Sequence, residues 1–368
     1  MPEYQFMISG GGTGGHIFPA VAIADELKKR YPDAQFLFVG ARDRMEMERV
    51  PQAGYNIEGL WISGIQRKLT ASNLLFPFKL FSSITRCQKL IRKFKPDVVI
   101  GTGGFASGPL LYVASRKNKP CLIQEQNSFP GITNKLLAPR VNTICVAYDK
   151  MERFFPQDKI VFTGNPIRSS VHAPLASKQA CYDELGLNPN RKTLLVLGGS
   201  LGARKINQLV ENNLNAILEM NMNLLWQSGK LYIDELLGKH GSRQNDQLQI
   251  KPFLQNMQGA YAIADGVISR AGAGTLSELA VLQKPSLLIP SPNVAEDHQT
   301  KNAMALVEKG AALIFRETDP ESQLLEKLKL LMDGREQEKL QKNIQALAKP
   351  KAAEHIVDEI EKLLPHAE

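Results

Sequence analysis

A single imidazole follows a glycine-rich stretch close to the start of the chain. Residues 5–23 read QFMISGGGTGGHIFPAVAI, in which an apolar run leads through five glycines into His16. Glycine has no Cβ, so such a loop can approach a ligand closely, and the first turn of a following helix directs its N–H groups at an anion. An imidazole can take up a proton near neutral pH, and a helix N-terminus favours its neutral, accepting form. The stretch therefore predicts an anion-binding loop with His16 as a general base.

Two further glycine-rich stretches repeat this arrangement. The first reads GGSLGAR over residues 198–204, and the second reads SRAGAGTLSELA over residues 269–280. Each follows an apolar run, so we expect both to present backbone N–H groups to a phosphate at the start of a helix. Thr275 and Ser277 would add hydroxyl donors. Glu278 lies one turn into the expected helix, where its carboxylate either accepts both hydroxyls of a ribose or lies in solvent.

A polar cluster near residue 300 suits a ligand with many hydroxyl groups. Residues 296–303 read EDHQTKNA and place His298, Gln299 and Asn302 near an expected helix start. Imidazole and amide groups can donate or accept hydrogen bonds, as sugar hydroxyls require. The cluster indicates sugar binding, with a polar helix cap as the alternative.

The first loop also fits a dinucleotide fingerprint, but only formally. Gly10, Gly12 and Gly15 have G-x-G-x-x-G spacing, yet the next strand should end in an acidic residue that binds a ribose. That strand ends in Val39-Gly40, and Asp43 comes later. No Gly-Lys-Ser/Thr follows, which excludes a Walker P-loop. A nicotinamide-dependent oxidoreductase is therefore the weaker alternative.

Cysteine and acidic residues give no sign of a metal or a cofactor. The four cysteines lack C-x-x-C spacing, which favours reduced thiols over a zinc site or disulfides. Asp-x-Asp, a pair of carboxylates that can bind a divalent cation, is absent from this sequence. We expect neither a metal nor a cofactor.

Short β-rich runs alternate with helix-length amphipathic stretches, which predicts parallel sheets covered by helices on both faces. The expected strands are 4–9, 35–39, 97–101, 121–124 and 142–146, then 193–197, 223–226, 266–269, 286–289 and 311–315. A Pro-, Ser- and Gly-rich segment separates the two series. We therefore expect an α/β protein with two doubly wound, Rossmann-like domains facing a cleft. The expected domains are 1–165, 166–342 and a C-terminal helix in 343–368 that packs back on the first domain.

The formal charge of +8 is concentrated in one segment. Between Gly59 and Pro96 there are eight basic residues and no acidic one, which points to an anionic partner. The spacing of Leu80, Ile84, Cys87, Ile91 and Phe94 predicts one buried helix face. The apolar residues outside this stripe and the cations near them fit docking on an anionic lipid surface, namely Leu74, Leu75, Phe76, Phe78, Lys79 and Arg86.

A buried helix with a solvated basic face is the alternative reading of this segment. Its cations alternate with aliphatic side chains rather than with aromatic stacking positions, so nucleic acid is not an expected partner. No run approaches the roughly 18 apolar residues that a membrane span needs.

Taken together and in order, seven motifs resemble the series found in the MurG family of bacterial N-acetylglucosaminyltransferases. They are GGGTGGHIFPA, GTGGFASGP, QEQN, GNPIR, GGSLGA, RAGAGTLSE and DHQTKNA, and the resemblance spans residues 6–303. The resemblance implies a GT-B enzyme that transfers N-acetylglucosamine from UDP-N-acetylglucosamine to the C4 hydroxyl of lipid-linked muramyl-pentapeptide, with inversion, in peptidoglycan synthesis. It implies a peripheral location on the cytoplasmic face of the bacterial plasma membrane and leaves open contacts with other cell-wall synthesis proteins.

The resemblance also implies roles for individual residues. His16 would be the base, with Glu125 as a weaker candidate or as the residue that orients His16. The loop 273–278 would bind diphosphate, Glu278 the ribose, and Leu254 the uracil. The residues implied to bind the donor are Thr13, Gly14, Gly15, Asn127, Arg168, Ser200, Leu254, Ala273, Gly274, Thr275, Leu276, Ser277, Glu278, His298 and Gln299. Those implied to bind the acceptor are Gly103, Gly104, Phe105 and Asn134.

Overall fold

The structure is a computed structural model that describes residues 4–64, 74–167, 177–199 and 201–365. It divides into unit 1, residues 1–168 and 349–368, and unit 2, residues 169–348. The expected boundary at residue 343 falls inside the last helix of unit 2, whose Leu340 belongs to the core of that unit. The chain returns to unit 1 only after residue 348.

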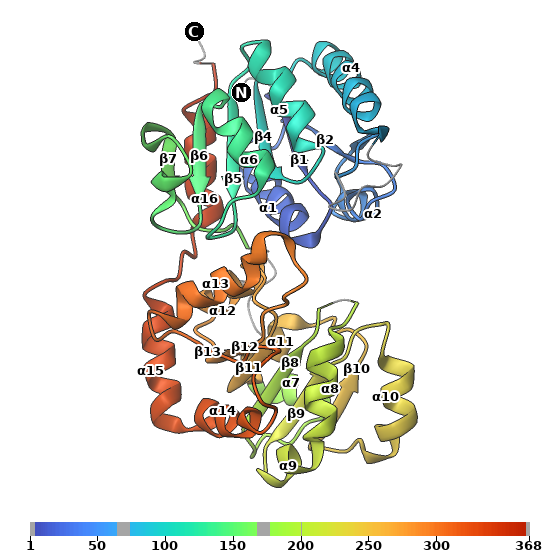
Figure 1. Ribbon diagram of the computed structural model, residues 1–368, viewed down its shortest axis with the longest axis vertical. Coiled ribbons are helices and arrows are strands. Elements are labelled where there is room, and N and C mark those ends of the chain that lie inside the picture. The colour runs from blue at the N-terminus through green and yellow to red at the C-terminus, as the bar shows by residue number, and fades with distance from the viewer. Residues whose placement is uncertain (1–3, 65–73, 168–176, 200, 366–368) are drawn as a thin grey trace. The chain divides into compact units, whose positions relative to one another are not determined.

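Unit 1 contains a seven-stranded parallel sheet in the order β3-β2-β1-β4-β5-β6-β7 (Figure 1). Its strands are β1 (Gln5–Gly10), β2 (Gln35–Ala41), β3 (Ile57–Leu60), β4 (Val98–Gly103), β5 (Cys121–Glu125), β6 (Thr143–Val146) and β7 (Ile160–Phe162). Its α-helices are α1 (Gly14–Arg30), α2 (Glu46–Gln52), α4 (Phe76–Phe94), α5 (Ser107–Arg116), α6 (Ile132–Leu137) and α16 (Ala352–Glu361).

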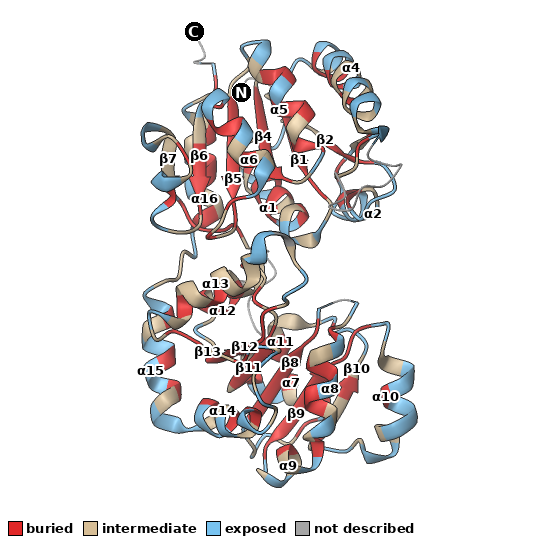
Figure 2. Ribbon diagram, in the orientation of Figure 1, coloured by how far each residue is buried: buried red, intermediate tan, exposed pale blue. Residues whose placement is uncertain are grey.

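Alternate residues of β1 enter two different cores, because successive side chains of a strand point to opposite faces. Phe6 and Ile8 are buried with side chains of α1 and α16, whereas Met7 is buried with side chains of α4 and α5. Figure 2 shows the buried strands between helices whose outer faces are exposed. The sheet is therefore covered on both faces, as a parallel sheet requires.

The return of the chain to unit 1 is fixed by α16, which packs beside α1. Ile356, Val357 and Ile360 are fully buried in the core that α1 completes. At the edge of this contact, Arg30 pairs with Asp358 at 2.7 Å. Apolar burial thus holds the C-terminal helix in unit 1.

Unit 2 contains a six-stranded parallel sheet in the order β10-β9-β8-β11-β12-β13. Its strands are β8 (Thr193–Leu197), β9 (Asn223–Gln227), β10 (Leu248–Lys251), β11 (Gly266–Ser269), β12 (Ser286–Leu288) and β13 (Leu313–Ile314). Its α-helices are α7 (Lys178–Leu185), α8 (Arg204–Asn212), α9 (Leu214–Glu219), α10 (Ile233–His240), α11 (Met257–Ile263), α12 (Ala273–Val281), α13 (His298–Val307), α14 (Gln323–Met332) and α15 (Gly334–Gln345).

Both sheets reverse their strand order next to their first strand, which confirms the expected doubly wound, Rossmann-like class. In such sheets ligands bind outside the carboxyl ends of the strands where the order reverses. In unit 1 this point lies between β1 and β4, and in unit 2 it lies between β8 and β11. The three glycine-rich stretches therefore follow strands at these two points. Across the described ranges, no helix is both long and apolar enough to cross a bilayer.

Candidate active site

The glycines of the first loop have two roles. Some leave space for neighbouring protein atoms, and others leave the backbone accessible to a ligand. A Cβ on Gly10 would overlap Oγ1 of Thr102, and one on Gly11 would overlap Oε1 of Glu46. Gly12 has a φ of +84°, and nothing lies within 4 Å of the position a Cβ would take there. The loop is therefore packed against the protein at Gly10 and Gly11 and is open at Gly12.

His16 lies in the first turn of α1, just after Thr13, Gly14 and Gly15. Its Nδ1 lies 2.9 Å from the carbonyl oxygen of Gly11. A carbonyl oxygen can only accept, so Nδ1 carries the proton, and Nε2 is the basic nitrogen of the neutral ring. This is the tautomer that a base acting through Nε2 needs. The partner of Nδ1 is a backbone carbonyl, so Glu125 takes no part in this contact.

The loop after β4 lies against the ring of His16. A Cβ on Gly103 would lie 3.0 Å from Nε2 of His16, and one on Gly104 would overlap the carbonyl oxygen of Gly11. Both glycines have positive φ, +104° and +90°. The next residue, Phe105, is 44% exposed. Three of the four expected acceptor residues thus lie at the end of β4, beside the candidate base.

Glu125 ends β5 and organises the segment that follows it. The side chain is 1% exposed. Its Oε1 accepts from the backbone N and from Nδ2 of Asn127 at 3.0 and 3.1 Å. Its Oε2 accepts from the backbone N of Gly131 at 3.1 Å and from Nδ2 of Asn134 at 2.8 Å. These contacts favour a positioning role for Glu125 over that of a base. Asn134 is itself 2% exposed, which favours support of this segment over direct acceptor contact.

In unit 2, the start of α12 is open to an anion. Gly272 precedes the helix and has no side chain to cap it, and the first N–H groups of any helix lack intrahelical acceptors. A Cβ on Gly274 would meet no atom within 4 Å. Ala273 and Leu276 are buried and anchor the helix. The hydroxyl of Ser277 was expected to donate a hydrogen bond to a phosphate. In the structure it donates to the carbonyl oxygen of Ala273, within the same helix, at 3.0 Å.

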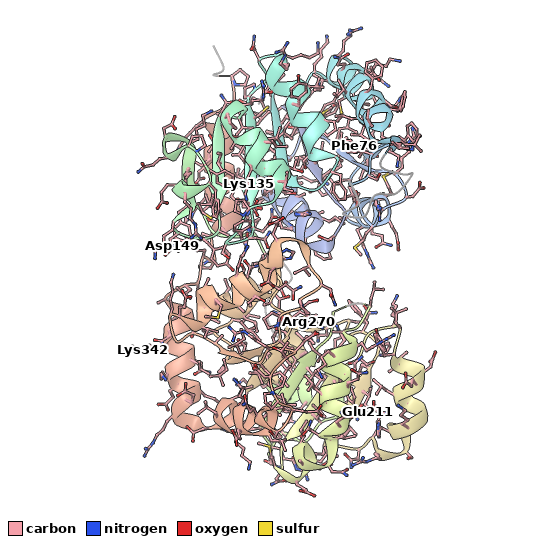
Figure 3. All side chains as sticks on the ribbon, in the orientation of Figure 1. Phe76, Lys135, Asp149, Glu211, Arg270 and Lys342 are labelled. Atoms are coloured by element: carbon pink, nitrogen blue, oxygen red, sulfur yellow. The ribbon has the colours of Figure 1, made fainter. Side chains whose placement is uncertain are left out.

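Glu278 is buried against α11 rather than lying in solvent, so the alternative of a solvated helix residue is wrong. The side chain is 7% exposed, and its Oε2 accepts from the hydroxyl of Tyr261 at 3.3 Å. Arg270, labelled in Figure 3, comes between β11 and α12. It donates to the carbonyl oxygen of Ile289 and pairs with Glu317 at 2.6 Å. Its contacts hold the strand end that precedes the loop.

Gln227 connects the loop after β8 to Leu254. Its Oε1 accepts from the backbone N of Leu254 at 2.9 Å, and its Nε2 donates to the carbonyl oxygen of Gly199 at 3.2 Å. Leu254 is 3% exposed. Ser200, which the same loop contains, and Arg168 both lie outside the described residues.

His298 is the first residue of α13, and the two residues before it have unusual backbone angles. Glu296 and Asp297 have φ values of +55° and +49°. This left-handed conformation costs a non-glycine residue about 1–3 kcal/mol, and residues that adopt it cluster at functional sites. Oε1 of Gln299 accepts from the backbone N of Ser291 at 2.9 Å. The side-chain oxygen of Gln299 is therefore already hydrogen-bonded within the protein.

The helix expected to dock on a membrane is present as α4, but not all of the side chains assigned to its docking surface are exposed. Leu74, Leu75 and Phe78 are exposed by 77%, 47% and 68%. Phe76, labelled in Figure 3, instead packs against the core of unit 1, so its assignment to the docking surface is wrong. Lys79 donates to Oγ of Ser63 at 2.9 Å, and Arg86 pairs with Glu58 at 2.7 Å.

Four residues that the structure brings to these sites were not predicted from the sequence, namely Glu46, Phe81, Gln227 and Tyr261. Phe81 is 71% exposed on α4, and its position outside the apolar stripe was a signal that could have found it. Gln227 is the last residue of β9, and a polar residue at the carboxyl end of a parallel strand lies where ligands bind. No sequence pattern around Glu46 or Tyr261 predicts their roles, because their polar groups are buried by contacts with residues from other elements.

Comparison with known proteins assigns both halves of the chain to one family. The family model of the glycosyltransferase family 28 N-terminal domain matches residues 6–146, and that of the C-terminal domain matches residues 193–358. Two curated relatives are named UDP-N-acetylglucosamine–N-acetylmuramyl-(pentapeptide) pyrophosphoryl-undecaprenol N-acetylglucosamine transferase. The protein from Flavobacterium psychrophilum is 53% identical over 365 residues, 99% of each chain. That from Christiangramia forsetii is 53% identical over 365 residues, 98% of each chain.

A solved structure agrees with this assignment. The crystal structure of Acinetobacter baumannii MurG is 29% identical and has a TM-score of 0.77 to this chain. The match covers 98% of this chain and all of the other. The resemblance inferred from the seven motifs is confirmed, and the chain belongs to glycosyltransferase family 28.

Proposed function

We propose that this enzyme transfers N-acetylglucosamine from UDP-N-acetylglucosamine to the C4 hydroxyl of a lipid-linked N-acetylmuramyl-pentapeptide. The observation that carries this proposal is the 53% identity over nearly the full chain with transferases named for this donor and acceptor. The matched region covers both units and therefore includes the loops after β1, β4, β8 and β11. The product would be the disaccharide-pentapeptide precursor of peptidoglycan.

The proton of the acceptor hydroxyl passes to His16 in this mechanism. Nε2 of His16 accepts the proton while the C4 oxygen forms a bond to the anomeric carbon of the donor sugar. The bond from that carbon to the diphosphate oxygen breaks, and UDP leaves with the electron pair. Because the attack comes from the face opposite the leaving group, an α-linked donor gives a β1→4 product. The tautomer fixed by the 2.9 Å contact between Nδ1 and Gly11 supports this role for His16.

The negative charge of the leaving diphosphate is stabilised by main-chain groups of unit 2. The N–H groups at the start of α12 form an anion site, and the open space at Gly274 gives access to them. Glu278 binds the ribose hydroxyls while Tyr261 holds its carboxylate. Thr275, His298 and Gln299 complete the donor site, together with Arg168 and Ser200. Gly103, Gly104 and Phe105 contact the acceptor beside His16.

We also propose that α4 docks on an anionic membrane surface, where a lipid-linked acceptor resides. Its exposed apolar side chains are Phe78 and Phe81, and Leu74 and Leu75 are exposed just before its first residue. Lys89, Arg92 and Lys93 are exposed on the same helix and would face lipid phosphates. Each such cation near an anionic surface contributes about 1 kcal/mol. The docking is peripheral and reversible.

A transfer assay with a short-chain, water-soluble analogue of the acceptor tests the reaction separately from the docking. Incubation with UDP-N-acetylglucosamine is expected to yield UDP and a disaccharide whose anomeric proton shows the coupling of a β linkage. The Glu278→Ala variant serves as the matched control for donor recognition. Release of UDP without a disaccharide, or an α-linked product, would contradict the proposal.

A further inference from the structure

Glu46 is a fully buried carboxylate at the edge of the first glycine-rich loop. It is 0% exposed and begins α2. A buried carboxylate is costly unless hydrogen bonds satisfy its oxygens. Both oxygens have backbone donors: Oε1 accepts from the N of Ala41 at 3.0 Å, and Oε2 accepts from the N of Gly12 at 2.9 Å. The carboxylate thereby links the end of β2 to the loop that follows β1.

The space for this carboxylate is made by two glycines. A Cβ on Gly11 would overlap Oε1 of Glu46, and a Cβ on Gly40 would lie 2.5 Å from its Cγ. Any other residue at either position would displace the carboxyl group. The bare backbone at Gly11 is therefore required by Glu46, whatever ligand the loop binds.

A single peptide group connects Glu46 to His16. The N–H of Gly12 and the carbonyl of Gly11 belong to the same peptide unit, which is planar and has the two groups pointing in opposite directions. On one side the N–H donates to Glu46 at 2.9 Å, and on the other the carbonyl accepts from Nδ1 of His16 at 2.9 Å. Hydrogen bonds in such a chain polarise one another, so the carboxylate strengthens the carbonyl as an acceptor.

From this chain of contacts we infer that Glu46 is the positioning residue for His16, acting through the Gly11–Gly12 peptide. It fixes the orientation of the peptide, which keeps the proton of His16 on Nδ1 and leaves Nε2 as the accepting nitrogen. Its negative charge also stabilises the imidazolium that forms when Nε2 takes up a proton. Glu46 would thus act as the carboxylate does in a Ser-His-Asp triad, except that a peptide group lies between the carboxylate and the imidazole. The inference rests on the proposed role of His16 as the base.

A double-mutant cycle between Glu46→Gln and His16→Ala tests the inference. Glutamine keeps the size of the side chain but removes the charge and one of the two acceptors. We expect Glu46→Gln to lower kcat at least 10-fold, with KM for UDP-N-acetylglucosamine within about twofold of wild type. In a Ser-His-Asp triad, loss of the carboxylate that sets the histidine tautomer through a direct contact lowers kcat by about 10⁴-fold. In the His16→Ala background the same change should leave kcat unaltered. Equal losses in both backgrounds, or an unaltered kcat for Glu46→Gln alone, would overturn the inference. If His16→Ala itself kept wild-type kcat, the proposed function of His16 would fail instead.

Two measurements separate this role from a loss of folding. Tyr55→Phe is the control, since it removes a partly buried hydrogen bond of 2.7 Å from the Tyr55 hydroxyl to the carboxylate of Asp25 in the same unit. Thermal unfolding should show similar destabilisation for the two variants, while kcat falls only for Glu46→Gln. Independently, 15N NMR of histidine-labelled wild-type protein should show His16 protonated on Nδ1 and unprotonated on Nε2, with its signals assigned by their loss in His16→Ala. The opposite tautomer would overturn the inference even if Glu46→Gln did not fold.

Discussion

The hydroxyl of Tyr261 lies 3.3 Å from Oε2 of Glu278, and both side chains are buried. One residue comes from α11 and the other from α12, so the contact fixes the carboxylate relative to the anion-binding end of α12. This relationship means that the proposed ribose site depends on a residue that does not itself contact the ribose.

Tyr261→Phe is therefore expected to weaken donor binding without affecting chemistry. Loss of one hydrogen bond to a charged group costs about 1.5–3 kcal/mol at most, so Kd for UDP should rise about 10-fold. Glu278→Ala should raise it further, because it removes the carboxylate that binds both hydroxyls. Isothermal titration with UDP measures both values, and kcat at saturating donor should stay near wild type for Tyr261→Phe. An unchanged Kd in Glu278→Ala would rule out the ribose assignment.

Gly103→Ala should damage catalysis through His16. The added methyl group would lie 2.9 Å from Cδ2 and 3.0 Å from Nε2 of the ring, and the φ of +104° is unfavourable for alanine. We expect kcat to fall at least 10-fold as the ring is displaced, with stability lowered by about 1–3 kcal/mol. Gly238→Ala is the matched control, since it lies in α10 with nothing within 4 Å of its Cβ position. If steady-state kinetics showed equal kcat for the two variants, the packing of Gly103 on His16 would have no catalytic role.

Replacing Phe78 and Phe81 together by serine should weaken docking and spare the chemistry. These side chains are 68% and 71% exposed, so their loss removes apolar area from the proposed lipid contact but little from the core. Sedimentation with vesicles containing anionic lipid should show at least about 10-fold weaker binding, given 1.5–3 kcal/mol for a fully buried Phe. Leu231→Ser, at a site 69% exposed in unit 2, is the control and should bind vesicles as wild type does. Transfer to the short-chain acceptor should be unchanged, and an equal loss of both activities would refute the docking role.

The cysteines should be inert in the native protein. All four are buried, and burial raises the pKa of the Cys87 and Cys121 thiols to about 12 each. It also raises the pKa of the Cys145 thiol. The thiolate is the reactive form, so Ellman's reagent at pH 8 should label none of them until denaturant is added, and then all four. Rapid labelling of a native thiol would show that the structure around that cysteine opens readily.

The strands missed from the sequence all lie at edges of the sheets, although one edge strand, β13, was expected. All ten expected strands are present, but β3, β7 and β10 were not expected, and each lies at an edge of its sheet. A central strand such as β4 is buried throughout and reads as a continuous apolar run, whereas β7 is largely half-exposed or exposed. Edge strands have one neighbour and one partly solvated side, so their composition differs little from that of a loop.

The same contrast applies to the sites. The loops and His16 were predictable because glycine spacing and a helix start are local features. Phe76 was also within reach of the sequence, since it lies four residues before Leu80 and so continues the buried stripe of α4. By contrast, the contact between Glu46 and Gly12 was not predictable, because nothing in the sequence shows that the side chain of Glu46 reaches back 34 residues. Long-range hydrogen bonds of this kind are set by tertiary packing.

Single-turnover transfer by His16→Ala tests most directly whether Nε2 of His16 takes the proton of the acceptor hydroxyl. With saturating UDP-N-acetylglucosamine and short-chain acceptor, the rate of disaccharide formation should fall 10²- to 10⁴-fold, the contribution expected of a general base. The affinity for UDP should remain within about twofold of wild type. A variant that forms disaccharide at close to the wild-type rate would contradict the claim.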